Sequence, residues 1–136
     1  MPHPLFRERS SSAYLRSGTI AALSTAAGGA LGIIRLSGPR ALEVVSALSQ
    51  GKWVNPEPRT LSRIRLFDHA GILLDEGLAV YFAQGASFTG EAGVELQLHG
   101  GRHTLGRVLE ACFERGALPA LPGEFSFRAF QNGKLS

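Results

Sequence analysis

A segment around residue 95 restricts the fold more than any other, because its apolar and polar side chains alternate strictly. Successive side chains of an extended strand point to opposite faces. The segment Val94-Glu95-Leu96-Gln97-Leu98-His99 therefore has one apolar face and one polar face. This period predicts a strand that is covered on one side. The polar face, with Glu95, Gln97 and His99, is a candidate site.

Four other segments have the residues and boundaries of strands. They are Thr19–Thr25, Gly32–Ser37, Leu61–Phe67 and Leu74–Phe82. The small-residue run 26–30 is expected to form a loop, and residues 68–71 are expected to close a hairpin between the last two strands. Residues 51–60, which contain Trp53 and three Gly or Pro residues, are expected to form a surface connection.

Two segments between the strands have apolar residues at helical spacing. The first opens at Pro39, a residue suited to the first turn of a helix, and ends near Ser49. Its expected buried residues are Leu42, Val45 and Leu48. The second has an apolar stripe and a glycine at its expected C-cap. These residues are Leu105, Val108, Leu109, Cys112, Phe113 and the capping Gly116.

The last segment, 122–135, also has helical spacing. Its aromatic and charged residues recur three and four positions apart, at Phe127, Phe130 and Lys134 and at Glu124 and Arg128. This pattern predicts an apolar stripe that docks on the domain while charged groups face a site. With three helices interleaved among the strands, the sequence predicts an α+β fold with a mixed β-sheet and about three packed helices.

Length and composition indicate one globular domain without disulfides. A chain of 136 residues, 44% of them hydrophobic, supports one core, and its single cysteine, Cys112, is expected to be a buried thiol. No run reaches the ~20 apolar residues that a membrane span needs. The net charge of +3 comes mostly from residues 1–18, so it gives little support for a nucleic-acid footprint.

The basic start of the chain predicts a flexible arm over residues 1–17, followed by one domain over residues 18–136. The arm lacks the continuous apolar core of a secretory signal, so a cytoplasmic location is expected. A mitochondrial location is the alternative, because the arm has three arginines, several serines and one acidic residue.

Several catalytic motifs are missing from the sequence. A phosphate loop requires Gly-Lys followed by Ser or Thr, whereas Lys134 is followed by Leu135. The chain alone is therefore not expected to hydrolyse GTP or ATP. His99 and His103 stand on either side of a Gly-Gly break instead of on one helix face, which argues against a metal site.

Two charged residues in strand segments are candidate ligand-binding groups. Arg35 lies in an apolar strand, where a guanidinium is costly to bury unless an anion pairs with it. The Glu95 carboxylate can accept two parallel hydrogen bonds from an amino-pyrimidine edge. A structural ion pair at Arg35 and a solvent-facing carboxylate at Glu95 are equally compatible with the composition.

Five ordered blocks of the sequence resemble the N-terminal domain of the tRNA-modification GTPase MnmE (TrmE) family. The blocks are 18–25 (Gly-Thr-Ile-Ala-Ala-Leu-Ser-Thr), 32–39 (Gly-Ile-Ile-Arg-Leu-Ser-Gly-Pro), 87–91 (Ser-Phe-Thr-Gly-Glu), 95–101 (Glu-Leu-Gln-Leu-His-Gly-Gly) and the terminal run 122–135. The resemblance covers residues 18–136, and the terminal block is the most specific.

The resemblance implies a folate-binding domain, similar in fold to the tetrahydrofolate domains of aminomethyltransferases, that also joins two subunits into a homodimer. The family's folate positions correspond to Arg35, Glu95 and Lys134. The implied ligand is a tetrahydrofolate derivative, either 5-formyl- or 5,10-methylene-tetrahydrofolate. As hypotheses, we assign Glu95 to the pterin edge, and Arg35 and Lys134 to carbonyl or carboxylate oxygens of the ligand.

For the family's full-length protein, the resemblance implies a helical domain with an inserted G domain that uses potassium, GTP and magnesium. An FAD-dependent partner, MnmG, is implied as well. Together the two proteins build a 5-carboxymethylaminomethyl-type group on the tRNA wobble uridine, and the folate supplies the one-carbon unit. The G-domain motifs are not in this sequence, so binding and dimerisation are the activities expected of the chain, with no membrane partner.

The sequence also departs from the family's pattern. The 25–32 loop is one residue shorter and lacks the usual prolines, and Ala92 and Ser136 replace acidic residues. A stand-alone interaction domain that has lost folate binding is therefore an alternative. A small acid–base enzyme using Glu95 and His99 is another, although it would also need a nucleophile or a water-activating group.

Overall fold

The structure is a computed structural model that describes residues 16–24 and 31–134. Most of the expected arm, the expected loop 26–30 and the departure at Ser136 lie outside the described residues. In the described part of the chain, strands and helices alternate as the sequence predicts, and the fold is α+β.

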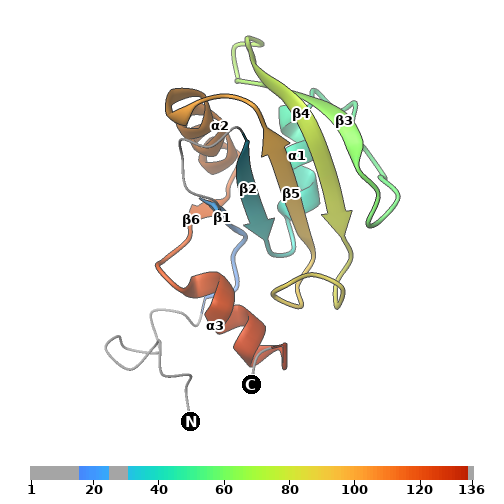
Figure 1. Cartoon of the computed structure of the whole chain (residues 1–136), viewed down its shortest axis with the longest axis vertical. Coiled ribbons are helices and arrows are strands. Elements are labelled where there is room, and N and C mark those ends of the chain that lie inside the picture. The colour runs from blue at the N-terminus through green and yellow to red at the C-terminus, as the bar shows by residue number, and fades with distance from the viewer. Residues whose placement is uncertain (1–15, 25–30, 135–136) are drawn as a thin grey trace.

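One mixed sheet organises the described residues (Figure 1), with its strands in the order β3-β4-β5-β2-β1-β6. The strands are β1 (Ile20–Leu23), β2 (Gly32–Ser37), β3 (Ser62–Phe67), β4 (Leu73–Phe82), β5 (Gly93–Leu98) and β6 (Leu118–Pro119). Neighbouring strands are antiparallel except for β1 and β6, which are parallel. The expected hairpin is present as β3 and β4, paired around the turn at 68–71.

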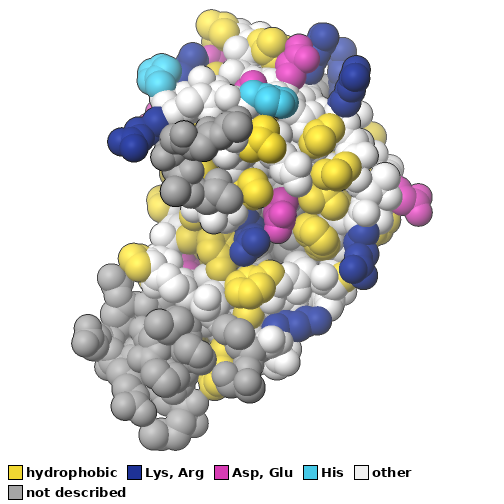
Figure 2. All heavy atoms as spheres, in the orientation of Figure 1, with side chains coloured by type: hydrophobic (Ala, Val, Ile, Leu, Met, Phe, Trp, Pro, Cys, Tyr) yellow, Lys and Arg dark blue, Asp and Glu magenta, His cyan; other side chains and the backbone are white. Residues whose placement is uncertain are grey.

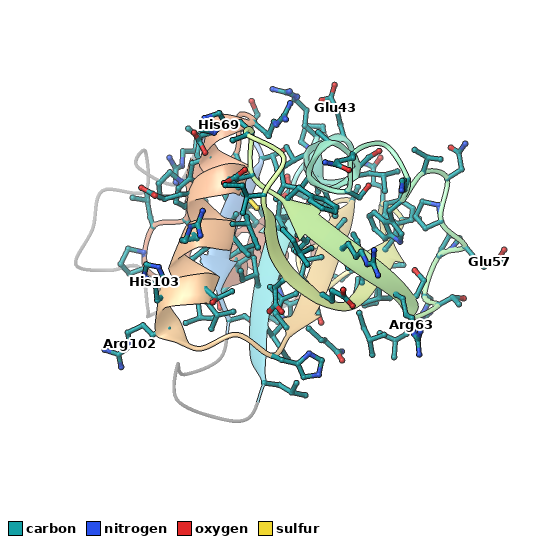
Figure 3. All side chains as sticks on the ribbon, turned by 90° about the horizontal axis from the view of Figure 1, so that it is seen from above. Glu43, Glu57, Arg63, His69, Arg102 and His103 are labelled. Atoms are coloured by element: carbon teal, nitrogen blue, oxygen red, sulfur yellow. The ribbon has the colours of Figure 1, made fainter. Side chains whose placement is uncertain are left out.

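Two helices cover one face of this sheet (Figures 1 and 3), and the core lies between them and the strands. They are α1 (Ala41–Leu48) and α2 (Arg102–Glu114). The third helix, α3 (Glu124–Gln131), lies at the end of the sheet, beside the loop that joins β4 and β5 (Figure 1). Within the described residues, no helix is long and apolar enough to cross a membrane.

The alternation in β5 is confirmed, because Val94, Leu96 and Leu98 are each 0% exposed and face the helices. Neighbouring strands contribute the residues that the pairing register places on the same face, including Ile34 and Leu36. Cys112 is buried in this core, as expected, and desolvation raises the pKa of its thiol to about 12. The thiol is therefore neutral and unreactive at physiological pH.

Some expectations about the helices are corrected by the structure. The helix expected to open at Pro39 begins at Ala41, and it buries Val44 where Leu42 was expected, because Leu42 is only half-buried. The surface connection 51–60 is mostly exposed, but Trp53 is buried and its indole N–H donates to Ser62 Oγ at 2.9 Å. An indole needs a partner for its one donor when it is buried, and the edge strand provides it.

The strand β6 was not predicted, because two residues that include a proline have no period to recognise. Its position depends on β1, where the backbone N–H of Leu118 donates to the carbonyl of Thr19 at 2.8 Å. This pairing is the parallel contact that makes the sheet mixed.

Among the described residues, no helix lies over the centre of the opposite face of the sheet, which is called the open face below. Figure 2 shows hydrophobic side chains on this face around one basic and one acidic side chain that lie side by side. The register of β2, β4 and β5 assigns to it the half-buried residues Ile33, Arg35, Leu78, Phe82, Glu95 and Gln97.

Candidate functional site

An ion pair lies in the middle of the open face. Arg35 in β2 and Glu95 in β5 are direct partners in the antiparallel register, so their side chains leave the sheet side by side. Arg35 Nε and Nη2 each lie 3.2 Å from Glu95 Oε2. The two side chains are 28% and 22% exposed, so solvent reaches the pair while the sheet fixes its position.

The geometry of this pair leaves hydrogen-bonding capacity at its edge. Both contacts from Arg35 end on the same oxygen of Glu95, so Arg35 Nη1 and Glu95 Oε1 have no hydrogen-bond partner among the described residues. One group donates and the other accepts. The pair therefore presents a donor beside an acceptor, which suits a ligand edge with a carbonyl next to an N–H group.

Two aromatic rings flank the guanidinium of Arg35. Its Cζ lies 5.2 Å from the centroid of the Phe88 ring and 5.9 Å from that of Phe125. These distances are within the range of cation–π attraction. The rings come from different parts of the chain, Phe88 from the β4–β5 loop and Phe125 from the first turn of α3. Neither contact was predicted, because the local spacing of residues in the sequence does not reveal it.

The β4–β5 loop is fixed to the sheet by hydroxyl groups. Ser37 Oγ lies 2.6 Å from Thr89 Oγ1 and donates to Glu91 Oε1 at 2.8 Å. Ser87 Oγ hydrogen-bonds the backbone carbonyl of Glu91 from within the loop. Thr89 is 1% exposed, so the loop is anchored in the protein although its tip reaches solvent.

Four charged residues, called the α3 charge cluster below, connect α3 to the rest of the protein. They are Arg16, Glu91, Glu124 and Arg128. Arg16 Nε lies 2.8 Å from Glu124 Oε2, and Arg128 Nη1 lies 2.9 Å from Glu91 Oε1. Glu124 is 0% and Arg128 3% exposed. The expectation that these two helix charges face a site is wrong for Glu124, which is fully buried, whereas Arg128 pairs with it at 3.3 Å and also lines a hollow of about 440 Å³.

The electrostatics of the cluster favour ionised Glu124. Burial alone would raise the pKa of its carboxyl group, but the hydrogen bonds from Arg16 and the Leu121 backbone N–H, and the charges of Arg16 and Arg128, outweigh it. The pKa of Glu124 therefore lies below its ordinary value. The pKa of Arg16 is raised, chiefly by its hydrogen bond to Glu124.

Lys134 is placed near this corner but not in contact with the ion pair. The α3 helix ends at Gln131, and Gly133 with φ +76° turns the chain, so Lys134 lies beyond the helix instead of continuing its stripe. Its Nζ donates to the carbonyl of Gly85, at the start of the β4–β5 loop, at 2.6 Å. The structure thus brings Arg35 and Glu95 together, whereas Lys134 contacts the β4–β5 loop, which also holds Phe88.

The acid–base pairing of Glu95 with His99 has no support from the geometry. Four residues of extended strand separate two positions by roughly 13 Å. Glu95 pairs with Arg35, whereas His99 Nδ1 lies 3.3 Å from the carbonyl oxygen of Glu76. His103 points outward from the start of α2 (Figure 3). In the described part of the chain, no group of three or more His, Cys, Asp or Glu is arranged to hold a metal.

The open face is shallow at the ion pair. The depression there, lined by Arg35, Phe88 and Glu95 among others, has a volume of about 10 Å³. Ligand pockets usually have volumes of ≈ 300–1,000 Å³. Two larger hollows lie elsewhere, one of about 440 Å³ beside the α3 charge cluster and one of about 730 Å³ near Trp53. A single chain in this conformation therefore provides a binding edge and flanking rings, but not an enclosing pocket.

Comparison with known proteins gives a consistent result. A family model described as "GTP-binding protein TrmE N-terminus" matches residues 19–134. The protein named tRNA modification GTPase MnmE in Thiobacillus denitrificans is 50% identical over 121 residues, which is 88% of this chain and 26% of that protein. The protein of the same name in Paramagnetospirillum magneticum is 51% identical over 120 residues, covering 88% and 27%. The chain thus spans about a quarter of the length of these curated relatives.

Proposed function

Because the chain belongs to the family of TrmE N-terminal domains, we propose that it is the folate-binding and dimerising part of a tRNA-modification GTPase. The ligand is a tetrahydrofolate derivative, 5-formyl- or 5,10-methylene-tetrahydrofolate. Arg35, Glu95 and Lys134 are its contacts.

The donor–acceptor edge of Arg35 and Glu95 supports this proposal most directly. A 2-amino-4-oxo-pyrimidine ring has N–H donors and a carbonyl acceptor along one side, which complements a carboxylate oxygen beside a guanidinium N–H. Glu95 Oε1 would accept from the pterin edge and Arg35 Nη1 would donate to a ligand oxygen. The acidic and basic partners already lie at 3.2 Å, so little rearrangement is needed to present both.

Lys134 is proposed to bind a carboxylate of the ligand's glutamate tail. Its ammonium group contacts a backbone carbonyl and is otherwise exposed. A lysine bonded only to a neutral oxygen can exchange that contact for a carboxylate, which is a stronger partner. The ligand would then extend from the ion pair past the β4–β5 loop toward the end of α3.

Dimerisation through the open face is the second part of the proposal. Half-buried apolar side chains such as Ile33, Leu78 and Phe82 surround the ion pair there. A ligand on a surface with a depression of about 10 Å³ would remain largely in water. A second copy of the chain would add a wall to this shallow site and bury the apolar residues.

We further propose that this module works in the same way as its relatives' N-terminal part within a longer protein. There it would accompany a helical domain and a G domain that uses GTP, magnesium and potassium. An FAD-dependent MnmG-type partner would modify the wobble uridine of tRNA with the one-carbon unit of the folate. The protein would act in the cytoplasm.

A second candidate function follows from the shallow site. If the free edge of the Arg35–Glu95 pair takes no ligand, the chain is an interaction and dimerisation domain that has lost folate binding. The small depression at the pair favours this alternative.

Calorimetric titration with 5-formyltetrahydrofolate separates the two functions. We expect saturable binding near one ligand per chain. Glu95→Gln keeps the shape of the side chain but removes its charge, and it should weaken binding by about 1.5 to 3 kcal/mol, the value of hydrogen bonds to charged groups. Glu43→Gln, in an exposed ion pair with Arg40, is the matched control and should bind like the parent. A folded parent that gives no heat of binding would favour the interaction domain.

A further inference from the structure

The side chain of Phe88 is exposed next to the Arg35–Glu95 ion pair. It is 45% exposed, and it is the one aromatic among the large exposed hydrophobic residues of the described chain. Its ring lies against the guanidinium of Arg35 at 5.2 Å. An aromatic ring beside a partly exposed ion pair is the combination of apolar and polar groups that lines ligand sites.

The turn that holds Phe88 is rigid for a surface loop. The neighbouring Thr89 is 1% exposed, and its hydroxyl lies 2.6 Å from Ser37 Oγ in β2. From the other side, Asn132 Nδ2 donates to the carbonyl of Thr89 at 2.8 Å. Gly90 has φ +83°, and a Cβ there would lie 2.8 Å from Asn132 Cβ, so α3 and the loop are closely packed. A ring fixed in advance loses little entropy when a ligand stacks on it.

We propose that Phe88 determines the specificity of the site for a flat ring, by stacking on the ring whose edge meets Arg35 and Glu95. This inference rests on the proposed folate function and adds a residue to it. A ligand edge that reaches the guanidinium comes within reach of the Phe88 ring, because the guanidinium itself is in contact with that ring. An open-chain amide could form the same hydrogen bonds, but it would gain nothing from stacking.

Phe125 has a different part in this arrangement. It contacts the same guanidinium from α3 at 5.9 Å and is only partly exposed. We therefore assign it to the support of Arg35 and not to the ligand. Phe125→Leu is then a matched comparison for Phe88→Leu, since both substitutions replace a ring next to Arg35 by an aliphatic side chain.

The test is a set of titrations of the 136-residue chain with 5-formyltetrahydrofolate and with p-aminobenzoylglutamate, which has the tail of a folate without the pteridine ring. Phe88→Ala should weaken binding of the folate by about tenfold or more, the usual effect of removing one stacked aromatic, and should leave binding of p-aminobenzoylglutamate unchanged. Phe88→Leu should have an intermediate effect, larger than that of Phe125→Leu. Phe88→Trp should keep the affinity, and its emission should be quenched by the folate.

The outcomes separate this inference from the proposed function. If the parent binds the folate and Phe88→Ala binds it equally well, or if Phe125→Leu has the larger effect, the role of Phe88 is overturned while the folate function stands. If the folded parent binds no folate, both fail. Thermal unfolding of each variant shows whether the fold is intact, and if Phe88→Ala does not fold, Phe88→Leu and the quenching of Phe88→Trp decide the question. Ile72→Ala, at an exposed aliphatic residue in the β3–β4 turn, is the control and should change neither affinity.

Discussion

The helix-covered face of the sheet and the corner around α3 are held together in different ways. The covered face is apolar throughout, with residues such as Leu36 and Leu96 fully buried against α1 and α2. The α3 corner has a small apolar cluster of Phe127 and Leu121, and ion pairs and hydrogen bonds connect it to the rest of the protein. The candidate site lies on the open face of the same sheet, next to the α3 corner.

This difference indicates that the stability of the α3 corner depends on pH and salt more than that of the covered face does. Burial of apolar surface is insensitive to pH and weakly dependent on salt, whereas charge networks depend on both. Arg35 and Glu95 stand on the rigid sheet, while Phe125 and Lys134 stand on or after α3. The geometry of the proposed ligand site therefore depends on how well the α3 charge cluster keeps Phe125 and Lys134 in place.

The largest expected effect tests the α3 charge cluster. Glu124→Ala removes the carboxylate that pairs with Arg16 and the buried Arg128. Breaking a buried pair from one side typically costs about 3 to 5 kcal/mol, and here buried Arg128 would lose one of its two carboxylate partners. Urea unfolding measures this loss. The exposed pair Arg40–Glu43 provides the matched control, and Glu43→Ala should cost less than about 1 kcal/mol. Equal effects of the two substitutions would show that the corner does not depend on its charges.

The next effect tests the covered face. Leu96→Ala leaves a cavity in the centre of the core, where Leu96 is 0% exposed. The expected loss of unfolding free energy is about 2 to 5 kcal/mol. It should be the same at pH 5 and pH 7, since no ionisable group is involved. If the loss of unfolding free energy in Leu96→Ala changes with pH, the covered face and the α3 corner do not differ in their dependence on charge.

A smaller effect tests the contact between the β4–β5 loop and α3. Gly90→Ala introduces a residue at φ +83° and places its Cβ 2.8 Å from Asn132 Cβ. Positive φ alone costs an ordinary residue about 1 to 3 kcal/mol. Gly85→Ala is the control for this strain, because Gly85 has φ +91° with no atom within 4 Å of the added Cβ. Gly90→Ala should lower the melting temperature more than Gly85→Ala. The difference between the two decreases measures how closely α3 packs on the loop.

The smallest expected effect is a change of protein stability in the acid range, caused by the protonation of Glu124. The folded-state pKa of Glu124 lies below its ordinary value of 4.5, so its contribution to stability is present above about pH 4.5 and is lost as the pH falls through the folded pKa. Glu124→Gln should flatten the stability profile in this acid range. Asp68 has a lowered pKa as well, first from the backbone N–H of Ile72, so Asp68→Asn is needed to separate the two contributions. A profile unchanged by Glu124→Gln would contradict the lowered pKa.

Much of the fold could be predicted from the sequence, because the periodic patterns that mark strands and helices lie within short segments. The alternation in β5 fixes which residues face the helices, and the helix α2 ends at Glu114, with Gly116 at φ +106° just after it. The strand β6 and the end of α3 before Lys134 could not be predicted, since both depend on partners or turns outside any periodic run. The roles of Arg35, Glu95 and Lys134 in folate binding remain predictions.

The sequence by itself determined the order of the strands and helices other than β6, the covered face of the sheet and the family to which the chain belongs. Only the tertiary structure decided that Arg35 pairs with Glu95, that Phe88 and Phe125 flank this pair, and that Glu124 and Arg128 turn inward toward Arg16 and Glu91. The physical reason is the range of the interactions. Periodic burial is encoded within a few residues, whereas an ion pair or a ring contact joins segments that are brought together only when the chain has folded.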